Sequence, residues 1–188
     1  GDDLSGTFGR FPNPLSTYDH KRGDVLLDGD GYFGTGTNLF NDSSLLYDGS
    51  YYKQTIIHEI GHALGLGHPH DANNGYGSNS SLSKAMTTMS YKDYYNDVST
   101  DTPNLTQAPH TLMILDIAAL QMMYGVNQQH NTEENVYTIS SFSSQNYIYA
   151  TIWDAGGNDT ISWGGQNTTG HIGLRDGWYS YFGDVEYG

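Results

Sequence analysis

Residues 55–70 read TIIHEIGHALGLGHPH, a short stretch that contains four histidines. The apolar residues of 56–64 fall near helical spacing, which predicts a helix. His58 and His62 are four residues apart on that helix, so both rings lie on one face, one turn apart. Gly65 is expected to end the helix, because glycine adopts the left-handed conformation that closes helices. The chain can then turn back and bring His68 to the other two histidines.

Three neutral imidazoles can hold Zn²⁺ through nitrogen and leave its fourth position open. Glu59 follows His58 directly and can accept a proton from water at that metal without binding it. The full pattern His-Glu-x-x-His-x-x-Gly-x-x-His is the signature of the metzincin zinc proteases, which the chain resembles. We therefore predict that His58, His62 and His68 bind zinc and that Glu59 is the catalytic base. The alternative is a polar helix with incidental histidines, which the five matched positions disfavour.

The composition narrows the classes of partner and of site. The 188 residues suit one domain with a small appendage. Seven basic residues against 21 acidic ones give a formal net charge of −14, so we expect neither nucleic acid nor an anionic membrane as a partner. Bound cations would offset part of this charge. The absence of cysteine excludes disulfides and thiolate metal sites. No apolar run has transmembrane length, and GDDLSGTFGR is no signal peptide.

The remaining segments predict an α+β chain. Short strands are expected at 5–11 and 23–28, and mostly loop at 68–108. The stretch APHTLMILDIAALQMMYG, 108–125, predicts a second helix that ends at Gly125. Its expected apolar stripe is Leu112, Leu115, Ala119 and Met122, and its expected core-filling methionines are Met113, Met122 and Met123. Further strands are expected at 135–139, 146–153, 159–163 and 171–174.

Within the metzincins, the chain resembles the serralysins, which are secreted bacterial zinc proteases. The stretch TTMSY, 87–91, matches the Met-turn beneath the metal, with Met89 as its methionine. The resemblance implies that Tyr91 is an additional zinc ligand that leaves the metal during catalysis and stabilises the oxyanion. Residues 116–125 are similar to the family's helix after the Met-turn. His70, which follows Pro69, is predicted to be a surface residue.

The C-terminal part resembles the entry into the calcium-binding β-roll of the serralysins. This likeness rests on TIWDAGGNDTISW, 151–163, and on GLRDGWYS, 173–180. Asp154, Gly156 and Asp159 are the predicted Ca²⁺ ligands, since calcium prefers oxygen donors. NTEEN, 131–135, stands where the family has an Arg-x-Gly-x-Thr calcium segment and lacks its arginine and glycine. The alternative is a plain Asx-Gly turn between strands.

The resemblance implies two parts. Residues 1–125 are expected to form a metzincin-like protease domain with a zinc-binding helix, a Met-turn and a C-terminal helix. Residues 126–188 are expected to be a β-rich segment like the start of a β-roll. Only 57 residues precede His58, fewer than in the family, and the tandem glycine-rich repeats are missing. We therefore expect the first half of the usual N-terminal subdomain to be missing, replaced or supplied elsewhere.

The predicted function is a secreted, extracellular zinc endopeptidase that cleaves extracellular proteins. Its substrate peptide would lie extended along a strand edge near Thr7 and Phe8. A missing N-terminal segment and a proteinaceous inhibitor are further candidate partners. The alternatives are a binding module with a purely structural metal and a fragment that folds only with a missing segment. Glu59 favours the enzyme, because a structural zinc site needs no carboxylate beside its first histidine.

Overall fold

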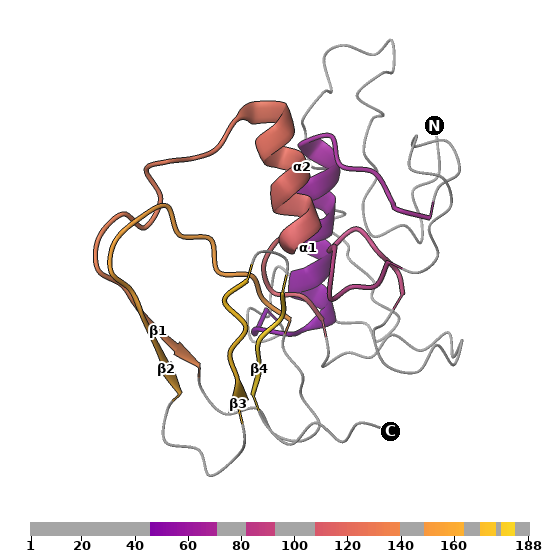
Figure 1. Cartoon of the computed structure of the whole chain (residues 1–188). Helices are drawn as coiled ribbons and strands as arrows, with labels where there is room; N and C mark the ends of the chain where they lie inside the picture. Colours follow the sequence, from indigo (N-terminus) through magenta and orange to yellow (C-terminus); the bar gives the residue numbers. More distant parts are fainter. Residues whose placement is uncertain are drawn as a thin grey trace, which may run out of the picture.

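A computed structural model describes residues 46–70, 82–92, 108–139, 149–163, 170–175 and 178–182. In these ranges the elements follow in the order α1 (Tyr51–Ala63), α2 (Ile114–Tyr124), β1 (Val136–Ile139), β2 (Thr160–Trp163), β3 (Gly170–His171) and β4 (Tyr181–Phe182) (Figure 1). The expected mixture of helices and strands is confirmed. The strands expected at 5–11 and 23–28, and the substrate edge at Thr7 and Phe8, lie outside the described residues. None of the described helices is long and apolar enough to cross a membrane.

Helix α1 begins at Tyr51 and ends where its sequence predicts. Ser50 caps its start, because the serine hydroxyl accepts a hydrogen bond from Lys53 N at 3.1 Å. Gly65 has φ +97°, the left-handed conformation that favours glycine. Around it, Gly65 N donates to His62 O at 2.9 Å and Leu66 N donates to Gly61 O at 3.0 Å. This pair of bonds is a Schellman motif, and it turns the chain back toward the helix.

Helix α2 is shorter than the 108–125 stretch predicts and buries different residues. It starts at Ile114, because the residues before it bond to other segments: Ala108 N donates to Gly49 O and His110 N donates to Tyr149 O, both at 3.1 Å. Gly125 follows its end as expected, with φ +86°.

The prediction of three core-filling methionines is correct for Met113, which is 3% exposed. It is wrong for Met122 and Met123, which are 89% and 48% exposed. The predicted stripe is wrong too: its members are partly or largely exposed, and Asp116 is the buried residue of the helix. Asp116 can be buried because the Thr87 hydroxyl and the backbone N–H groups of Thr88 and Met113 donate hydrogen bonds to it.

The strands form two small sheets. Strand β1 pairs with β2 in parallel, from Val136 opposite Thr160 to Ile139 opposite Trp163, and β3 pairs antiparallel with β4. The strands expected at 135–139 and 159–163 are therefore confirmed to within one residue. The strand expected at 146–153 is wrong for its described residues, where Tyr149 makes only an isolated bridge to Pro109. The strand expected at 171–174 ends at His171.

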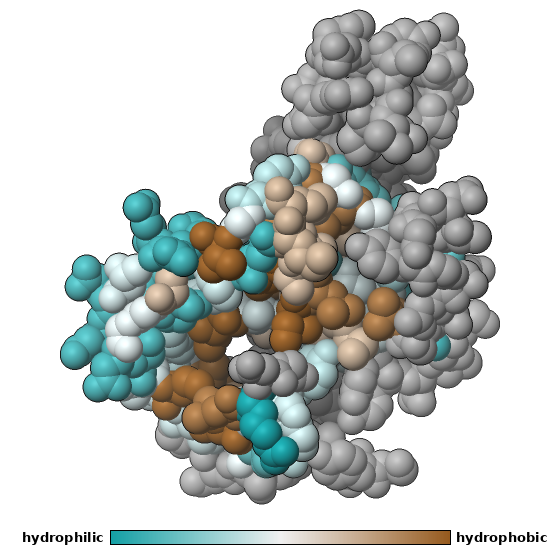
Figure 2. Space-filling view, turned by 45° about the horizontal axis from the view of Figure 1, so that its top comes forward, coloured by the Kyte–Doolittle hydropathy of each residue, from teal (hydrophilic) through white to brown (hydrophobic). Residues whose placement is uncertain are grey.

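The described surface carries large apolar side chains. Figure 2 shows that hydrophobic residues gather in patches on the face that it presents. Exposed members in the C-terminal part include Val136, Ile172, Leu174 and Trp178. Between the sheets, the rings of Trp163 and Phe182 stack with their centroids 4.7 Å apart. The packing of the C-terminal part thus rests on short strands and aromatic contacts.

Candidate metal centre

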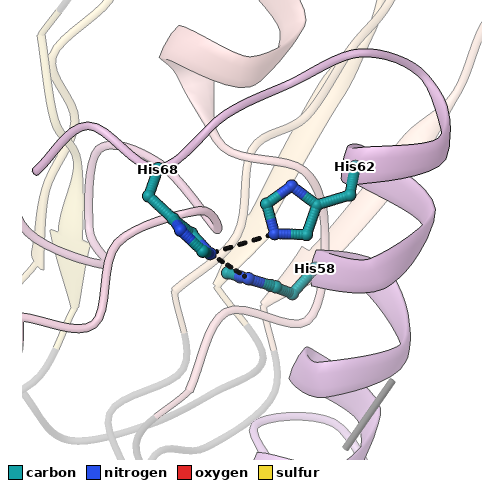
Figure 3. A group of neighbouring side chains, drawn as sticks. All are labelled: His58, His62 and His68. Atoms are coloured by element: carbon teal, nitrogen blue, oxygen red, sulfur yellow. Dashed lines mark hydrogen bonds between the residues drawn. The ribbon is translucent and has the colours of Figure 1, made fainter. Parts of the chain in front are cut away.

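The three predicted histidine ligands meet at one point. His58 and His62 project from α1, and His68 reaches them from the loop after the Schellman turn (Figure 3). His68 Nε2 lies 3.0 Å from His58 Nε2 and 2.9 Å from His62 Nε2. Among the described residues, these three form the one group of histidines and acids whose ligand atoms lie within 4.8 Å of one another.

Backbone carbonyls hold two of the rings in one tautomer. His58 Nδ1 lies 2.9 Å from Thr88 O, and His62 Nδ1 lies 2.8 Å from Leu66 O. A carbonyl oxygen only accepts, so each Nδ1 carries the proton and donates it. In a neutral imidazole the other nitrogen then has a lone pair and no proton. Both Nε2 lone pairs therefore point at His68.

This donor set fits a zinc ion. Three Nε2 atoms converge, and a single proton on His68 Nε2 can serve only one of the other two. A cation between the rings satisfies all three lone pairs at once. The nitrogens of tetrahedral zinc stand about 3.3 Å apart, close to the two distances found here. The carbonyls on the far nitrogens are the partners that metal-binding histidines usually have.

The electrostatics favour a neutral His58. Burial lowers the pKa of His58 to about 4, and the nearby rings of His62, His68 and His70 contribute in the same direction. A neutral imidazole is the form that binds a metal. His58 therefore needs no deprotonation near neutral pH before it can act as a ligand.

Glu59 lies beside the first ligand and is buried, with 7% of its surface exposed. Burial raises the pKa of its carboxyl group to about 7. A cation held by the histidines would favour the charged carboxylate. Glu59 is therefore a buried acid next to the first ligand in the chain.

The Met-turn lies directly beneath α1. Met89 is 1% exposed, and a Cβ built on Gly61 would come within 2.6 Å of its sulfur. The turn also supplies the carbonyl of Thr88 that receives the His58 proton. Met89 therefore packs against α1 at Gly61, between the two ligands His58 and His62 in the chain.

Tyr91 reaches the same point from the end of the turn. Its hydroxyl lies 2.8 Å from His68 Nε2, and its ring stacks on His58 with centroids 5.6 Å apart. The residue is 62% exposed, so a small rotation of its side chain meets little packing. The structure thus brings Tyr91 into the cluster, at a distance compatible with the ligand position expected from the sequence.

His70 differs from its expected surface position. Its ring stacks on His68, with centroids 5.0 Å apart and planes 10° apart, and it contacts the ring of Tyr91. It is half-buried. His70 does not belong to the group of converging ligand atoms and packs against the back of His68 instead.

Two residues of the centre, Gly61 and Asp116, were not predicted from the sequence. Gly61 provides the gap for Met89, and its signal was available, since glycine inside a helix costs about 1 kcal/mol and needs a reason. Asp116 is 2% exposed and bonds to the Met-turn. Its bonds to the Met-turn carry no local signal, because these two partners lie 28 and 29 residues away.

The structure also brings the predicted calcium segments together. Asn135 N donates to Asp159 Oδ1 at 2.9 Å, and Ala155 N donates to His130 O at 3.0 Å. Gly157 has φ +115° and leaves no room for a Cβ, because Glu133 O stands there. The NTEEN loop therefore lies directly against the 154–159 loop.

Oxygen atoms face this contact. Asp154 Oδ1 accepts from Gly156 N at 2.8 Å, and the Tyr137 hydroxyl donates to Asp154 Oδ2. The acid beside it raises the pKa of Tyr137. The two predicted acids and the carbonyl of Glu133 thus lie in two loops that contact each other. Among the described residues, no third acid or histidine joins the two acids within ligand distance.

Comparisons with known proteins give two family matches. The family model described as Matrixin, of the peptidase M10 family, matches residues 2–95. The family model described as Peptidase M10 serralysin C terminal matches residues 115–187. Together they cover both parts of the chain, and the first includes all three histidines, Glu59 and Tyr91.

Individual relatives agree with the family models. The chain is 34% identical to Serralysin of Proteus mirabilis over 98% of its length, and 34% identical to a Serralysin C of Dickeya chrysanthemi over 82%. It is 30% identical to Metallopeptidase AprA of Pseudomonas marginalis over 98%. It spans only 39%, 36% and 43% of these relatives, respectively. With the three-histidine cluster, the matches bear out zinc as the expected cofactor.

Proposed function

The chain belongs to the peptidase M10 family, and from that premise we propose that it is a serralysin-like zinc endopeptidase that hydrolyses peptide bonds. One observation carries the proposal: His58, His62 and His68 converge through nitrogen, and Glu59, next to His58 in the chain, is buried. A structural zinc site has four protein ligands and no use for such a carboxyl group. The family matches confirm the resemblance to metzincins that the zinc-binding signature indicates.

In the proposed centre, His58, His62 and His68 hold the metal, and Tyr91 is a fourth, exchangeable ligand. When bound, zinc acts as a Lewis acid that lowers the pKa of water and polarises the substrate carbonyl. The Thr88 and Leu66 carbonyls keep the His58 and His62 rings aimed during turnover. The histidines thus hold the metal in place and do not themselves exchange protons.

Glu59 is the proposed general base and acid. Its carboxylate takes a proton from the attacking water and delivers it to the leaving amine when the C–N bond breaks. Burial supports this role, since a water-excluded carboxylate is the stronger base. Glu59 follows the ligand His58 directly on α1.

Tyr91 is the proposed oxyanion donor. At rest its hydroxyl lies at the histidine cluster, as the 2.8 Å distance to His68 Nε2 supports. When a substrate arrives, the exposed side chain rotates away, and the hydroxyl donates a hydrogen bond to the oxygen that becomes negative. This bond forms mainly in the transition state, so it would raise kcat more than it strengthens binding.

We also propose Ca²⁺ in the C-terminal part, held by Asp154, Gly156 and Asp159 with carbonyls of the NTEEN loop. Support comes from the contact between the two loops and from the close approach of Glu133 O to Gly157. Calcium takes six to eight oxygen ligands, including carbonyls. The net charge of −14 favours cations further.

The proposal extends to the division of the chain into two parts, its location and its partners. We infer a protease domain over 1–125 and a β-rich, β-roll-like segment over 126–188, in a secreted protein that acts on extracellular proteins and peptides. The likeness to Serralysin of Proteus mirabilis supports this setting. A complementary N-terminal segment or a proteinaceous inhibitor would be additional partners.

A metal analysis combined with casein digestion tests the function. We expect one zinc per chain after gentle purification and digestion that stops with a chelator and returns with zinc. Zinc bound without digestion would indicate a metal-stabilised binding module instead. A chain that neither melts cooperatively nor binds zinc would indicate a fragment that needs a further segment.

A further inference from the structure

Asp116 is a buried acid that the proposed reaction does not use. It lies in the first turn of α2 and is 2% exposed. Three donors reach its carboxylate: Thr87 Oγ1 at 2.5 Å, Thr88 N at 2.7 Å and Met113 N at 2.9 Å. A buried acid with this many partners organises its surroundings, because each of the bonds fixes a group that would otherwise rotate.

Two of these bonds fix the backbone of the Met-turn. Asp116 Oδ2 holds the N–H of Thr88 directly. Asp116 Oδ1 holds the Thr87 hydroxyl, whose oxygen in turn accepts the N–H of Met89 at 3.1 Å. The peptide units on both sides of the Thr88 α-carbon are therefore anchored to one carboxylate.

The anchored peptide is the one that orients a histidine. In a trans peptide the N–H and the C=O point in opposite directions within one plane. Fixing the N–H of Met89 on the Thr87 hydroxyl thus aims the C=O of Thr88 the other way, toward His58 Nδ1 at 2.9 Å. Gln54 Nε2 lies near the same carbonyl at 3.4 Å, a longer and weaker contact.

We propose that Asp116 is a positioning residue of the zinc centre, which acts through the Thr87–Met89 backbone and the Thr88 carbonyl to set the orientation and tautomer of His58. The inference rests on the proposed zinc site. A carboxylate suits this role because it only accepts hydrogen bonds and serves all three donors. An amide that kept its oxygen on both N–H groups would turn its NH₂ toward the Thr87 hydroxyl and reverse the direction of that bond.

Zinc affinity of the zinc-loaded chain measures the effect, by competition with a chromophoric chelator. Asp116→Asn should bind zinc about tenfold more weakly than the parent, at the lower end of the losses seen when partners of metal ligands change. The His58 Nδ1–H proton resonance should also shift or broaden in this variant. A role in general stability alone would leave both readouts unchanged in the folded protein.

Thr87 provides a matched pair. Thr87→Val removes the hydroxyl that links Asp116 to Met89 and should also weaken zinc binding. Thr87→Ser keeps the hydroxyl and should restore the affinity of the parent. Asp48→Asn removes one acid from an exposed site, 57% exposed, and should leave zinc affinity unchanged, which excludes an effect of overall charge.

The outcomes separate this inference from the proposed function. Equal zinc affinity and an unchanged His58 resonance in folded Asp116→Asn would overturn the positioning role alone. If Asp116→Asn does not fold, equal affinities of Thr87→Val and Thr87→Ser would overturn it. A parent chain that binds no zinc would overturn the proposed function, and the positioning role with it.

Discussion

The sulfur of Met89 occupies the space in which a side chain on Gly61 would begin. A Cβ built on Gly61 comes within 2.6 Å of this sulfur and within 3.5 Å of Leu66 Cδ1. Because Met89 is 1% exposed, the sulfur has no solvent into which to move. The helix that carries two of the ligands therefore rests on the Met-turn through a glycine.

Gly61→Ala should destabilise the zinc-loaded chain, although the same change in an ordinary helix interior is stabilising by about 0.5–1 kcal/mol. Overpacking a buried site costs about 1–3 kcal/mol, so we expect a net loss of up to about 2 kcal/mol in the free energy of unfolding. Urea unfolding measures it. In a Met89→Leu background the loss should shrink, and an equal effect of Gly61→Ala in both backgrounds would contradict the contact.

Glu59→Gln should keep zinc and lose peptidase activity. The amide has nearly the shape of the acid but cannot take a proton from water, so we expect kcat to fall by about 10²–10⁴. Casein digestion and elemental analysis of the same preparation check both halves of the expectation. Activity at the level of the parent, or a preparation without zinc, would argue against the role as base.

Tyr91→Phe should lower kcat by about 10²–10³ with little change in KM, because one oxyanion donor is lost. Stability should barely change, since the residue is 62% exposed and the ring is kept. Steady-state kinetics on a peptide substrate give the two constants. A turnover within about twofold of the parent, far from the loss expected for an oxyanion donor, would mean that Tyr91 is only a packed tyrosine.

Calcium should raise the melting temperature of the zinc-loaded chain, because a ligand that binds only the folded state stabilises it by about 2.7 kcal/mol at a hundred times its Kd. Asp154→Asn should remove most of this rise. A calcium titration with zinc held constant checks it. Equal shifts in the parent and in Asp154→Asn would place any bound calcium elsewhere, and no shift in the parent would count against calcium altogether.

Local signals explain which parts the sequence could predict. The end of α1 at Gly65 follows from a residue that tolerates positive φ, and the meeting of the three histidines follows from spacing plus that turn. Both depend on residues within eleven positions of one another, so no distant partner is needed to infer them.

Distant partners explain the errors. The spacing of Met122 in α2 shows which residues share its face but not which face other segments cover, and the structure leaves Met122 exposed. Tyr149 has strand-like neighbours, yet its backbone partners are Pro109 and His110, some forty residues earlier. Asp116 is held by distant partners too, since Thr87 and Thr88 lie 29 and 28 residues earlier.

Helix α2 bonds to residues close to both carbonyls that hold histidine rings, Thr88 O and Leu66 O. At its start, Asp116 holds the backbone behind Thr88, and at its end the Tyr124 hydroxyl donates to Leu64 O at 2.8 Å, two residues before the carbonyl that holds His62. Local unfolding of α2 would therefore loosen two ligands at once. We expect each opening of α2 to release zinc, so the zinc off-rate should be at least as high as the opening rate of α2. Amide hydrogen exchange along 114–124 and the zinc off-rate should therefore rise together with temperature.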